Sequence, residues 1–178
     1  MKYVAFLRAV NVGKRQIKMV DLKEMFEAVG FQNVQTFIAS GNVTFESEER
    51  NKKVLIEKIE NEIEKKFDFH SEVMLRTINE LQQIIAESPF KDIPLDKNTI
   101  LYVGFLYNEL DASSIKKLAE LNNEVDTLKV KGYELYALRY RDKGESILNT
   151  NFLSKYIQTP MTMRNWNTIV KINLLLST

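Results

Sequence analysis

The chain contains no cysteine and a single histidine, and these two absences exclude several kinds of active site. Without cysteine there can be no disulfide, no thiolate nucleophile and no cysteine-based zinc site. A Ser-His-Asp triad would have to use His70, which lies just before a predicted strand and far along the chain from the polar loops described below. We therefore interpret His70 as an ordinary partly buried residue, and we expect neither a metal site nor a cofactor.

Long apolar runs and a charge excess of one sign are also absent. No stretch approaches the ~18 consecutive apolar residues of a membrane helix, and the N-terminal apolar run ends at Arg8, too soon for a secretion signal. The 25 lysines and arginines nearly balance the 24 carboxylates, so the net charge of +1 gives no general attraction to nucleic acids or anionic membranes. We expect a soluble, cytoplasmic protein that does not bind membranes.

What the sequence does contain is enough apolar material for a core. With 44% hydrophobic residues in 178, the chain can bury one domain or two small ones. Residues 3–7 form a continuous apolar run, which predicts a strand buried on both faces. Residues 34–39 and 42–46 predict a hairpin closed at Gly41. Between these strands, apolar residues at helical spacing precede a glycine suited to a helix end: Leu22, Met25, Phe26, Val29 and Gly30.

The chain continues with a second helix and a fourth strand. Residues 51–67 place apolar side chains at steps of four between lysines and glutamates, which predicts a long surface helix with one buried stripe. Residues 72–76 predict a strand, and Thr77 and Glu80 then fit a capping box at the start of a short helix. The order β-α-β-β-α-β is the ferredoxin-like pattern, in which helices cover one face of an antiparallel sheet.

The second half repeats part of this order. Residues 88–98 hold two of the three prolines and predict a boundary or crossover. Residues 100–107 predict another central strand, and Asp111 can cap the next helix, with Ile115, Leu118 and Ala119 facing inward. A hairpin over 125–131 and 133–140 should turn at Gly132. A short helix through Phe152–Ile157 and a last helix capped by Thr162 complete the chain.

These patterns predict an α+β protein built from two ferredoxin-like β-α-β-β units with antiparallel sheets and a helical C-terminus. We expect the first unit to span residues 1–76 as β-α-β-β-α-β. The second unit should span residues 77–178 and include the C-terminal helices. The tail over Ile172–Leu176 is too apolar to stay in solvent, so it should dock on the body of the protein or on another subunit.

Several short motifs have ordinary explanations. Gly13-Lys14 resembles the end of a phosphate-loop motif. That motif needs glycine at position 8 and a hydroxyl residue at position 15, where this chain has Arg8 and Arg15. The S-x-x-K spacing at Ser113 and Ser114 falls in the first turns of a predicted surface helix, where capping and solubility explain both residue types. Two aspartates between 92 and 96 are too few oxygens for a Mg²⁺ or Ca²⁺ site.

Polar residues with small, amide or guanidinium groups gather at three predicted strand ends and helix starts, where binding residues are commonly placed. A helix start at Thr162 would present free amides to an anion, and Arg164 could add a two-point contact. We therefore predict one polar cleft that binds a small anionic ligand, such as a phosphate-bearing one. Its candidate residues are Arg8, Asn11, Gly13, Lys18, Ser40, Gly41, Asn42, Thr162, Arg164, Asn165 and Lys171.

A structural role for the same residues stays open at this point. Asn11 and Asn42 can simply shape their loops, since asparagine tolerates left-handed backbone and forms side-chain turns. Thr162 can merely cap a helix, and Arg164 can pair with a surface carboxylate. Enzymatic activity is also open, because arginine, lysine and serine can stabilise charge and transfer protons without histidine or cysteine.

Two other functions compete with the anion site. The second hairpin carries tyrosines and basic residues on an antiparallel sheet, the arrangement with which ferredoxin-like domains stack RNA bases: Lys129, Lys131, Tyr133, Tyr136, Arg139, Tyr140 and Arg141. It lacks the aromatic RNP-type motif. Alternatively, the apolar C-terminal tail could make the protein a homodimer and thus an interaction protein.

Three segments resemble the signature segments of the bacterial family called domain of unknown function 1697, and they span nearly the whole chain: Phe6–Gly13, Ser40–Phe45 and Thr162–Thr168. The resemblance implies two linked ferredoxin-like units. It also implies that four further residues occupy positions where the family has similar residues: Lys18, Gly30, Ser146 and Lys171. Lys14 replaces the second glycine that usually follows Gly13, and Ile147 stands where a lysine often follows the serine. The family implies no activity.

Overall fold

A computed structural model describes residues 1–13, 15–38 and 40–177. The chain folds into two compact units, the first of Met1–Leu81 with Ile172–Thr178 and the second of Gln82–Lys171. It passes from the first unit to the second within one helix and returns within another, α3 (Ile78–Ala86) and α6 (Trp166–Ser177). Where the sequence predicted that the whole C-terminal helix belongs to the second unit, its last residues group with the first.

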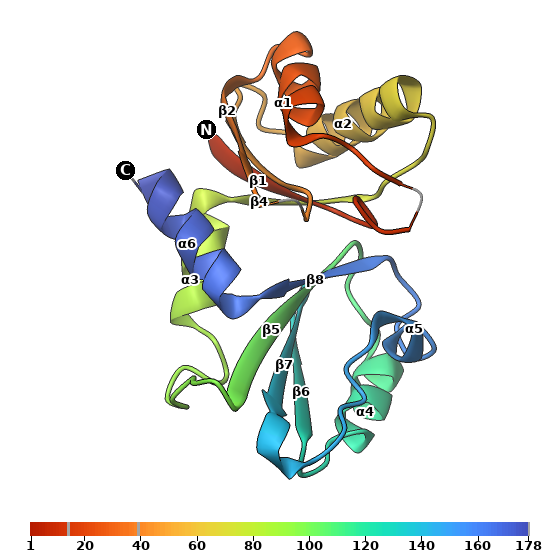
Figure 1. Ribbon diagram of the computed structural model, residues 1–178, viewed down its shortest axis with the longest axis vertical. Helices are drawn as coiled ribbons and strands as arrows, with labels where there is room; N and C mark the ends of the chain where they lie inside the picture. Colours follow the sequence, from red (N-terminus) through yellow and green to blue (C-terminus); the bar gives the residue numbers. More distant parts are fainter. Residues whose placement is uncertain (14, 39, 178) are drawn as a thin grey trace. The chain divides into compact units, whose positions relative to one another are not determined.

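The first unit is a four-stranded antiparallel sheet with two helices (Figure 1). The strand order is β2-β3-β1-β4, which is the ferredoxin-like order that the sequence predicts. The elements in chain order are β1 (Lys2–Leu7), α1 (Met19–Ala28), β2 (Gln32–Phe37), β3 (Asn42–Glu46), α2 (Lys52–Phe67) and β4 (Val73–Thr77).

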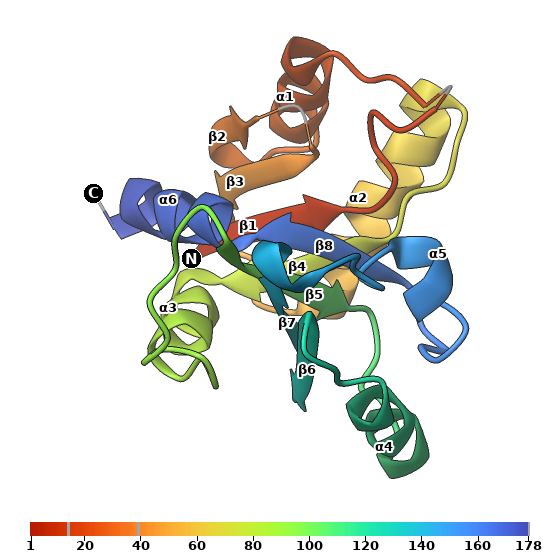
Figure 2. The same cartoon turned by 60° about the horizontal axis from the view of Figure 1, so that its bottom comes forward.

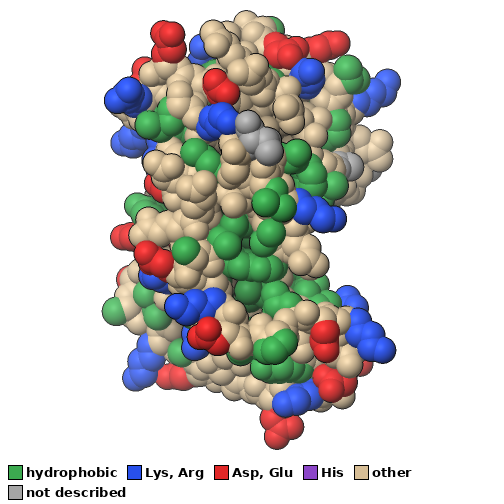
Figure 3. Space-filling view, turned by 90° about the vertical axis from the view of Figure 1, so that its left-hand side faces the viewer, with side chains coloured by type: hydrophobic (Ala, Val, Ile, Leu, Met, Phe, Trp, Pro, Cys, Tyr) green, Lys and Arg blue, Asp and Glu red, His purple; other side chains and the backbone are tan. Residues whose placement is uncertain are grey.

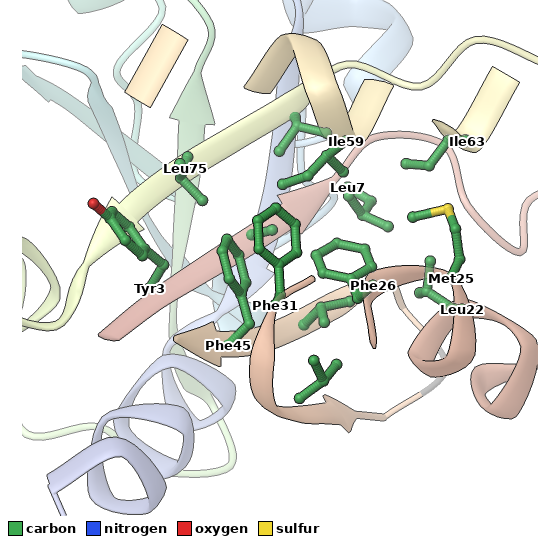
Figure 4. Close-up of a cluster of buried hydrophobic side chains, with 14 of the residues drawn as sticks. Tyr3, Leu7, Leu22, Met25, Phe26, Phe31, Phe45, Ile59, Ile63 and Leu75 are labelled. Carbon is green, nitrogen blue, oxygen red and sulfur yellow. The ribbon is translucent and has the colours of Figure 1, made fainter. Parts of the chain in front are cut away.

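The core of this unit lies between one face of the sheet and helices α1 and α2. Tyr3 and Phe45 stack across β1 and β3 with ring centroids 5.5 Å apart, and Phe31 lies 4.4 Å from Phe45 (Figure 4). From the helices, Leu22 and Ile59 pack into the same cluster. Each such fully buried side chain contributes about 1.5–3 kcal/mol, so this face of the sheet is fixed and the strand ends are held in place.

Register places three loops at the same end of this sheet. On the central strand β1, Phe6 pairs with Asn42 at the start of β3, and Leu7 pairs with Val73 at the start of β4. The segment that follows β1 therefore leaves the sheet beside the β2–β3 turn and beside the α2–β4 connection.

The second unit repeats the topology with strand order β6-β7-β5-β8. Helices α4 and α5 lie on the same side of this sheet in both views (Figures 1 and 2), and Leu118 and Leu153 from these helices share a core cluster with Leu135 and Leu106. The elements are β5 (Thr99–Leu106), α4 (Ala112–Glu120), β6 (Asp126–Lys131), β7 (Glu134–Tyr140), the 3-10 turn Arg141–Lys143, α5 (Thr150–Leu153) and β8 (Met161–Asn165).

The predictions for Thr162 and for the buried face of α4 are wrong, and α5 ends at Leu153 where the sequence predicted a helix to Ile157. Thr162 does not cap a helix, because Met161–Asn165 is strand β8, whose backbone groups pair with Tyr102–Leu106 of β5. The last helix begins at Trp166, and there Asn165 Oδ1 accepts a 2.9 Å hydrogen bond from the Asn167 amide. In α4, Ile115 and Ala119 are exposed, and the buried positions are Ser114 and Leu118.

The apolar tail docks on the first unit in part. Ile172 and Leu176 are buried, and the Lys2 ammonium donates to the Leu176 carbonyl oxygen at 2.8 Å. Leu174 and Leu175 remain 61% and 46% exposed. Among the described residues, none of the helices has the length and apolar character needed to cross a membrane.

Candidate functional site

Hydrogen bonds tie three connections together at the end of the first sheet. The Leu7 amide donates to the Gly41 carbonyl at 2.8 Å, and the Arg8 amide donates to the Glu72 carbonyl at 3.0 Å. The Ser71 hydroxyl returns a 2.8 Å bond to the Arg8 carbonyl. We call the β1–α1, β2–β3 and α2–β4 connections together the loop cluster of the first unit.

Arg8 holds the cluster together through its side chain as well. Its Nη1 atom lies 3.1 and 3.0 Å from the two carboxylate oxygens of Glu72. Burial alone would raise the pKa of Glu72, but hydrogen bonds from its own backbone and from Arg8, together with the guanidinium charge, hold that pKa below its ordinary value. The Glu72 carboxylate therefore stays ionised at neutral pH. The Arg8 side chain is still 39% exposed.

The segment after β1 has an unusual backbone. Ala9, Asn11 and Gly13 have φ angles of 54°, 58° and 61°, so left-handed residues alternate along the segment. Alanine has no local compensation for this conformation, whereas Asn11 does, because its Oδ1 accepts a 2.8 Å bond from the Ile17 amide. Backbone strain of this kind gathers at functional sites, where the surrounding structure over-determines it.

The β2–β3 turn is packed closely against this segment. Asn42 is fully buried, and its Nδ2 donates to the Phe37 carbonyl and to the Ser40 hydroxyl, each at 2.9 Å. Gly41 has φ 71°, and a Cβ there would lie 3.0 Å from Leu7 Cβ and 3.2 Å from Val10 Cβ. Close packing at Gly41 and the hydrogen bonds of the buried Asn42 side chain therefore stabilise one conformation of the turn.

Positive charge exceeds negative charge along the described part of this segment. The Arg15 guanidinium lies 5.3 Å over the Phe69 ring and donates to the His70 carbonyl at 3.5 Å. Lys18 is exposed at the N-cap of α1, and its side chain does not cap the helix. Lys14, which directly precedes Arg15, lies outside the described residues. The sequence prediction missed Arg15, Ser71 and Glu72, since nothing local in the sequence connects residues 8 and 72.

The remaining candidates belong to the second unit. Arg164 is buried on β8, and its Nη1 donates to the Thr162 hydroxyl at 2.6 Å and to the Met163 carbonyl at 2.8 Å. Burial lowers its pKa to about 10, so it remains charged at neutral pH. Lys171 is exposed. A single cleft lined by both groups of residues stays a prediction.

Of the tyrosines in the second hairpin, Tyr133 is 44% exposed, whereas Tyr136 is not available for base stacking. Tyr136 is buried, and its hydroxyl donates to the Ile84 carbonyl at 3.2 Å. Lys129 lies 4.9 Å over the Phe90 ring, and Lys131 forms an ion pair with Glu87. Basic and acidic side chains are mixed over the face shown in Figure 3, without a region of one sign.

Comparison with known proteins adds the family and the fold. A sequence profile described as a protein of unknown function (DUF1697) matches residues 1–136, a range that contains the whole loop cluster but ends before Thr162–Thr168. Among solved structures, the conserved bacterial protein SP0830 from Streptococcus pneumoniae is similar over 98% of both chains, with a TM-score of 0.70 and 20% identity. At that identity the likeness concerns the fold alone. No curated protein matches the chain.

Proposed function

The chain belongs to the DUF1697 family of proteins of unknown function, and from the geometry of its first unit we propose that it binds a small anionic ligand, such as a phosphate-bearing one, at the loop cluster. The observation that carries the proposal is the strained β1–α1 segment, which is locked to two other connections and rich in cations. A segment that served only to join β1 to α1 would not require three left-handed residues.

Arg8 still has free donors for a ligand. A guanidinium carries five N–H groups, and both bonds to Glu72 leave from Nη1. Within the described residues, its Nε and Nη2 atoms have no partner. These atoms match the spacing of two oxygens of a carboxylate or phosphate. Glu72 thus orients the guanidinium and leaves part of it for binding.

The rest of the cluster supplies further donors and charge. Successive amides in a backbone of alternating hand form concave sites for anions, and the Ala9–Gly13 stretch has this alternation. Lys18 and the uncapped N-terminus of α1 add positive potential beside it. Ser40 adds a hydroxyl from the neighbouring turn.

Thermal unfolding with a panel of phosphates, nucleotides, carboxylates and short oligonucleotides tests the proposal. A ligand that binds only the folded state stabilises it by about 2.7 kcal/mol at a hundredfold excess over its Kd. Arg8→Ala should lose the response. The matched control is Lys23→Ala, which removes one cation of an exposed i,i+4 ion pair with Glu27 in the same unit and should keep it.

A second variant separates binding from structure. Glu72→Gln removes the negative charge but keeps a polar group beside Arg8, so it should strengthen binding of any anion while it weakens the fold slightly. If the panel shifts neither the wild type nor Glu72→Gln, or if Arg8→Ala responds like the wild type, the loop cluster is not an anion site.

The exposed leucines favour one other candidate, a homodimer that uses the tail. Leu174 and Leu175 lie on α6 with about half of each side chain or more in solvent. Sedimentation velocity over a range of concentrations tests this. A mass that rises with concentration in the wild type, but not in Leu174→Ser, would support association through the tail, and a constant monomer mass would exclude it.

A further inference from the structure

A cavity of about 350 Å³ opens in the second unit, on the face of the sheet that carries α4 and α5. It is lined by Tyr102, Arg139, Leu148, Asn149, Met163 and Asn165. Its volume is near the lower end of the range for small-molecule sites, which is about 300–1,000 Å³. None of its lining residues belongs to the loop cluster, so the two proposed sites share no residue.

Arg139 is the cation of this cavity, and no carboxylate in the described part of the chain forms an ion pair with it. Its Nε atom is buried without a hydrogen-bond partner among the described residues. Its cross-strand neighbour is Asp126, a buried carboxylate that could have neutralised it. Instead Asp126 accepts from the Ser146 hydroxyl at 2.8 Å and from the Ile147 amide at 2.7 Å. A buried donor left unpaired costs free energy, and an acceptor from a ligand would remove that cost.

The same carboxylate builds one wall of the cavity. Because Asp126 holds Ser146 and Ile147, and the Leu148 amide donates to the Ser146 hydroxyl at 2.9 Å, the segment before α5 is fixed over the sheet. This places Leu148 and Asn149 at the cavity. It also explains Ser146, which the family resemblance singled out, as a residue that positions this wall.

The two asparagine side chains at the cavity offer donors. Asn149 Oδ1 accepts from the Phe152 amide at 2.7 Å, and Asn165 Oδ1 accepts from the Asn167 amide at 2.9 Å. Both side-chain oxygens are therefore in use, while each NH₂ group keeps its hydrogens for another partner. Together with Arg139, these groups favour a ligand that brings acceptor oxygens and negative charge.

We propose that this cavity binds a small organic anion. Its carboxylate or phosphate group contacts the Arg139 guanidinium and the amide groups of Asn149 and Asn165, and its apolar body packs against Tyr102, Leu148 and Met163. A guanidinium that faces a carboxylate or phosphate forms a strong charge-assisted pair. The volume of the cavity limits the body to about the size of one six-membered ring.

The Arg139 side chain itself provides the readout. Its Nε–H group gives a ¹H–¹⁵N resonance, assigned by its loss in Arg139→Gln. Phenyl phosphate and benzoate are the probes, benzamide is the neutral analogue, and inorganic phosphate is the anion without an apolar body. We expect at least one of the two organic anions to shift the Nε–H resonance in a saturable way, with benzamide and inorganic phosphate binding at least about tenfold more weakly.

Two variants and one control complete the test. Arg139→Gln should weaken binding of the organic anion tenfold or more, whereas Lys116→Gln, which removes an exposed cation of α4 in the same unit, should not. Leu148→Trp should fill the cavity and abolish binding while the Arg139 resonance persists, which shows that the fold is intact. The proposal is overturned if neither organic anion shifts the resonance, if benzamide or inorganic phosphate binds as tightly as they do, or if Leu148→Trp binds like the wild type.

Discussion

Arg8 and Glu72, which lie on different connections of the first sheet, are joined through both backbone and side chain. The Arg8 amide donates to the Glu72 carbonyl, and the Arg8 guanidinium contacts the Glu72 carboxylate. The backbone bond sets the position of the loop, and the ion pair sets the direction of the guanidinium. This double link turns the end of β1 into a fixed platform, which is what a binding site requires.

A double-mutant cycle measures the side-chain half of this link. We expect Arg8→Ala and Glu72→Ala to show a coupling energy of about 1 kcal/mol, because the pair is only partly exposed. The exposed pair of Lys23 and Glu27 should couple by only about 0.3–0.5 kcal/mol. Urea unfolding of the four proteins in each cycle gives both values. Equal coupling in the two cycles would mean that the Arg8 pair is an ordinary surface contact.

Acid should destabilise the first unit through Glu72 and Glu80. Burial opposes ionisation of Glu80, but hydrogen bonds from Lys52 and Thr77 outweigh it, so its pKa, like that of Glu72, lies below the ordinary 4.5. A lowered folded-state pKa stabilises the fold above pH 4.5, and this contribution is lost as pH falls through the folded-state value. Urea midpoints measured from pH 7 to about pH 3 should therefore fall, and less steeply in Glu72→Gln. An unchanged slope in that variant would contradict the shift at Glu72.

Two glycines of the loop cluster give a matched pair of substitutions. Both have positive φ, but a Cβ at Gly41 would meet Leu7 and Val10, whereas a Cβ at Gly13 would meet no atom within 4 Å among the described residues. Gly13→Ala should cost only the left-handed backbone energy of about 1–2 kcal/mol. Gly41→Ala should cost about 1–3 kcal/mol more, as overpacking does. Chemical unfolding tests the difference, and equal losses would show that the turn can move away from β1.

Local signals in the sequence predicted local structure well. The Thr77 hydroxyl accepts from the Glu80 amide at 3.2 Å and the Glu80 carboxylate accepts from the Thr77 amide at 2.8 Å, as the capping box requires. Asp111 likewise caps α4, with its Oδ1 2.6 Å from the Ser114 amide. Both caps depend on residues only three positions apart, so sequence alone contains the necessary information.

The features that the sequence did not predict depend on contacts between segments that are distant in the chain. Thr162 has the chemistry of a helix cap, but its backbone pairs with Phe105, some sixty residues earlier in the chain, and pairing in the sheet outweighs the local preference. The partner of Arg8 and the isolation of Arg139 also depend on cross-strand register. The sequence therefore indicated which loops are polar, but not which carboxylates form ion pairs with the arginines and lysines.

The capping box itself should be measurable. Thr77→Ala removes the acceptor for the Glu80 amide at the start of α3, and helix caps of this kind contribute about 1 kcal/mol. Asn79→Ala, an exposed change in the first turn of the same helix, is the control and should change stability by less than about 0.5 kcal/mol. Urea unfolding of both variants decides whether the stability of the protein depends on this cap of α3.

The most direct test of the central claim is a ¹H–¹⁵N titration of the wild type with inorganic phosphate. If the loop cluster binds anions, the backbone amides of Arg8–Gly13 and of Ser40 should shift in a saturable way, and Arg8→Ala should lose these shifts while Lys23→Ala keeps them. Saturable shifts confined to residues of the second unit, or no saturable shift at these amides, would contradict the account.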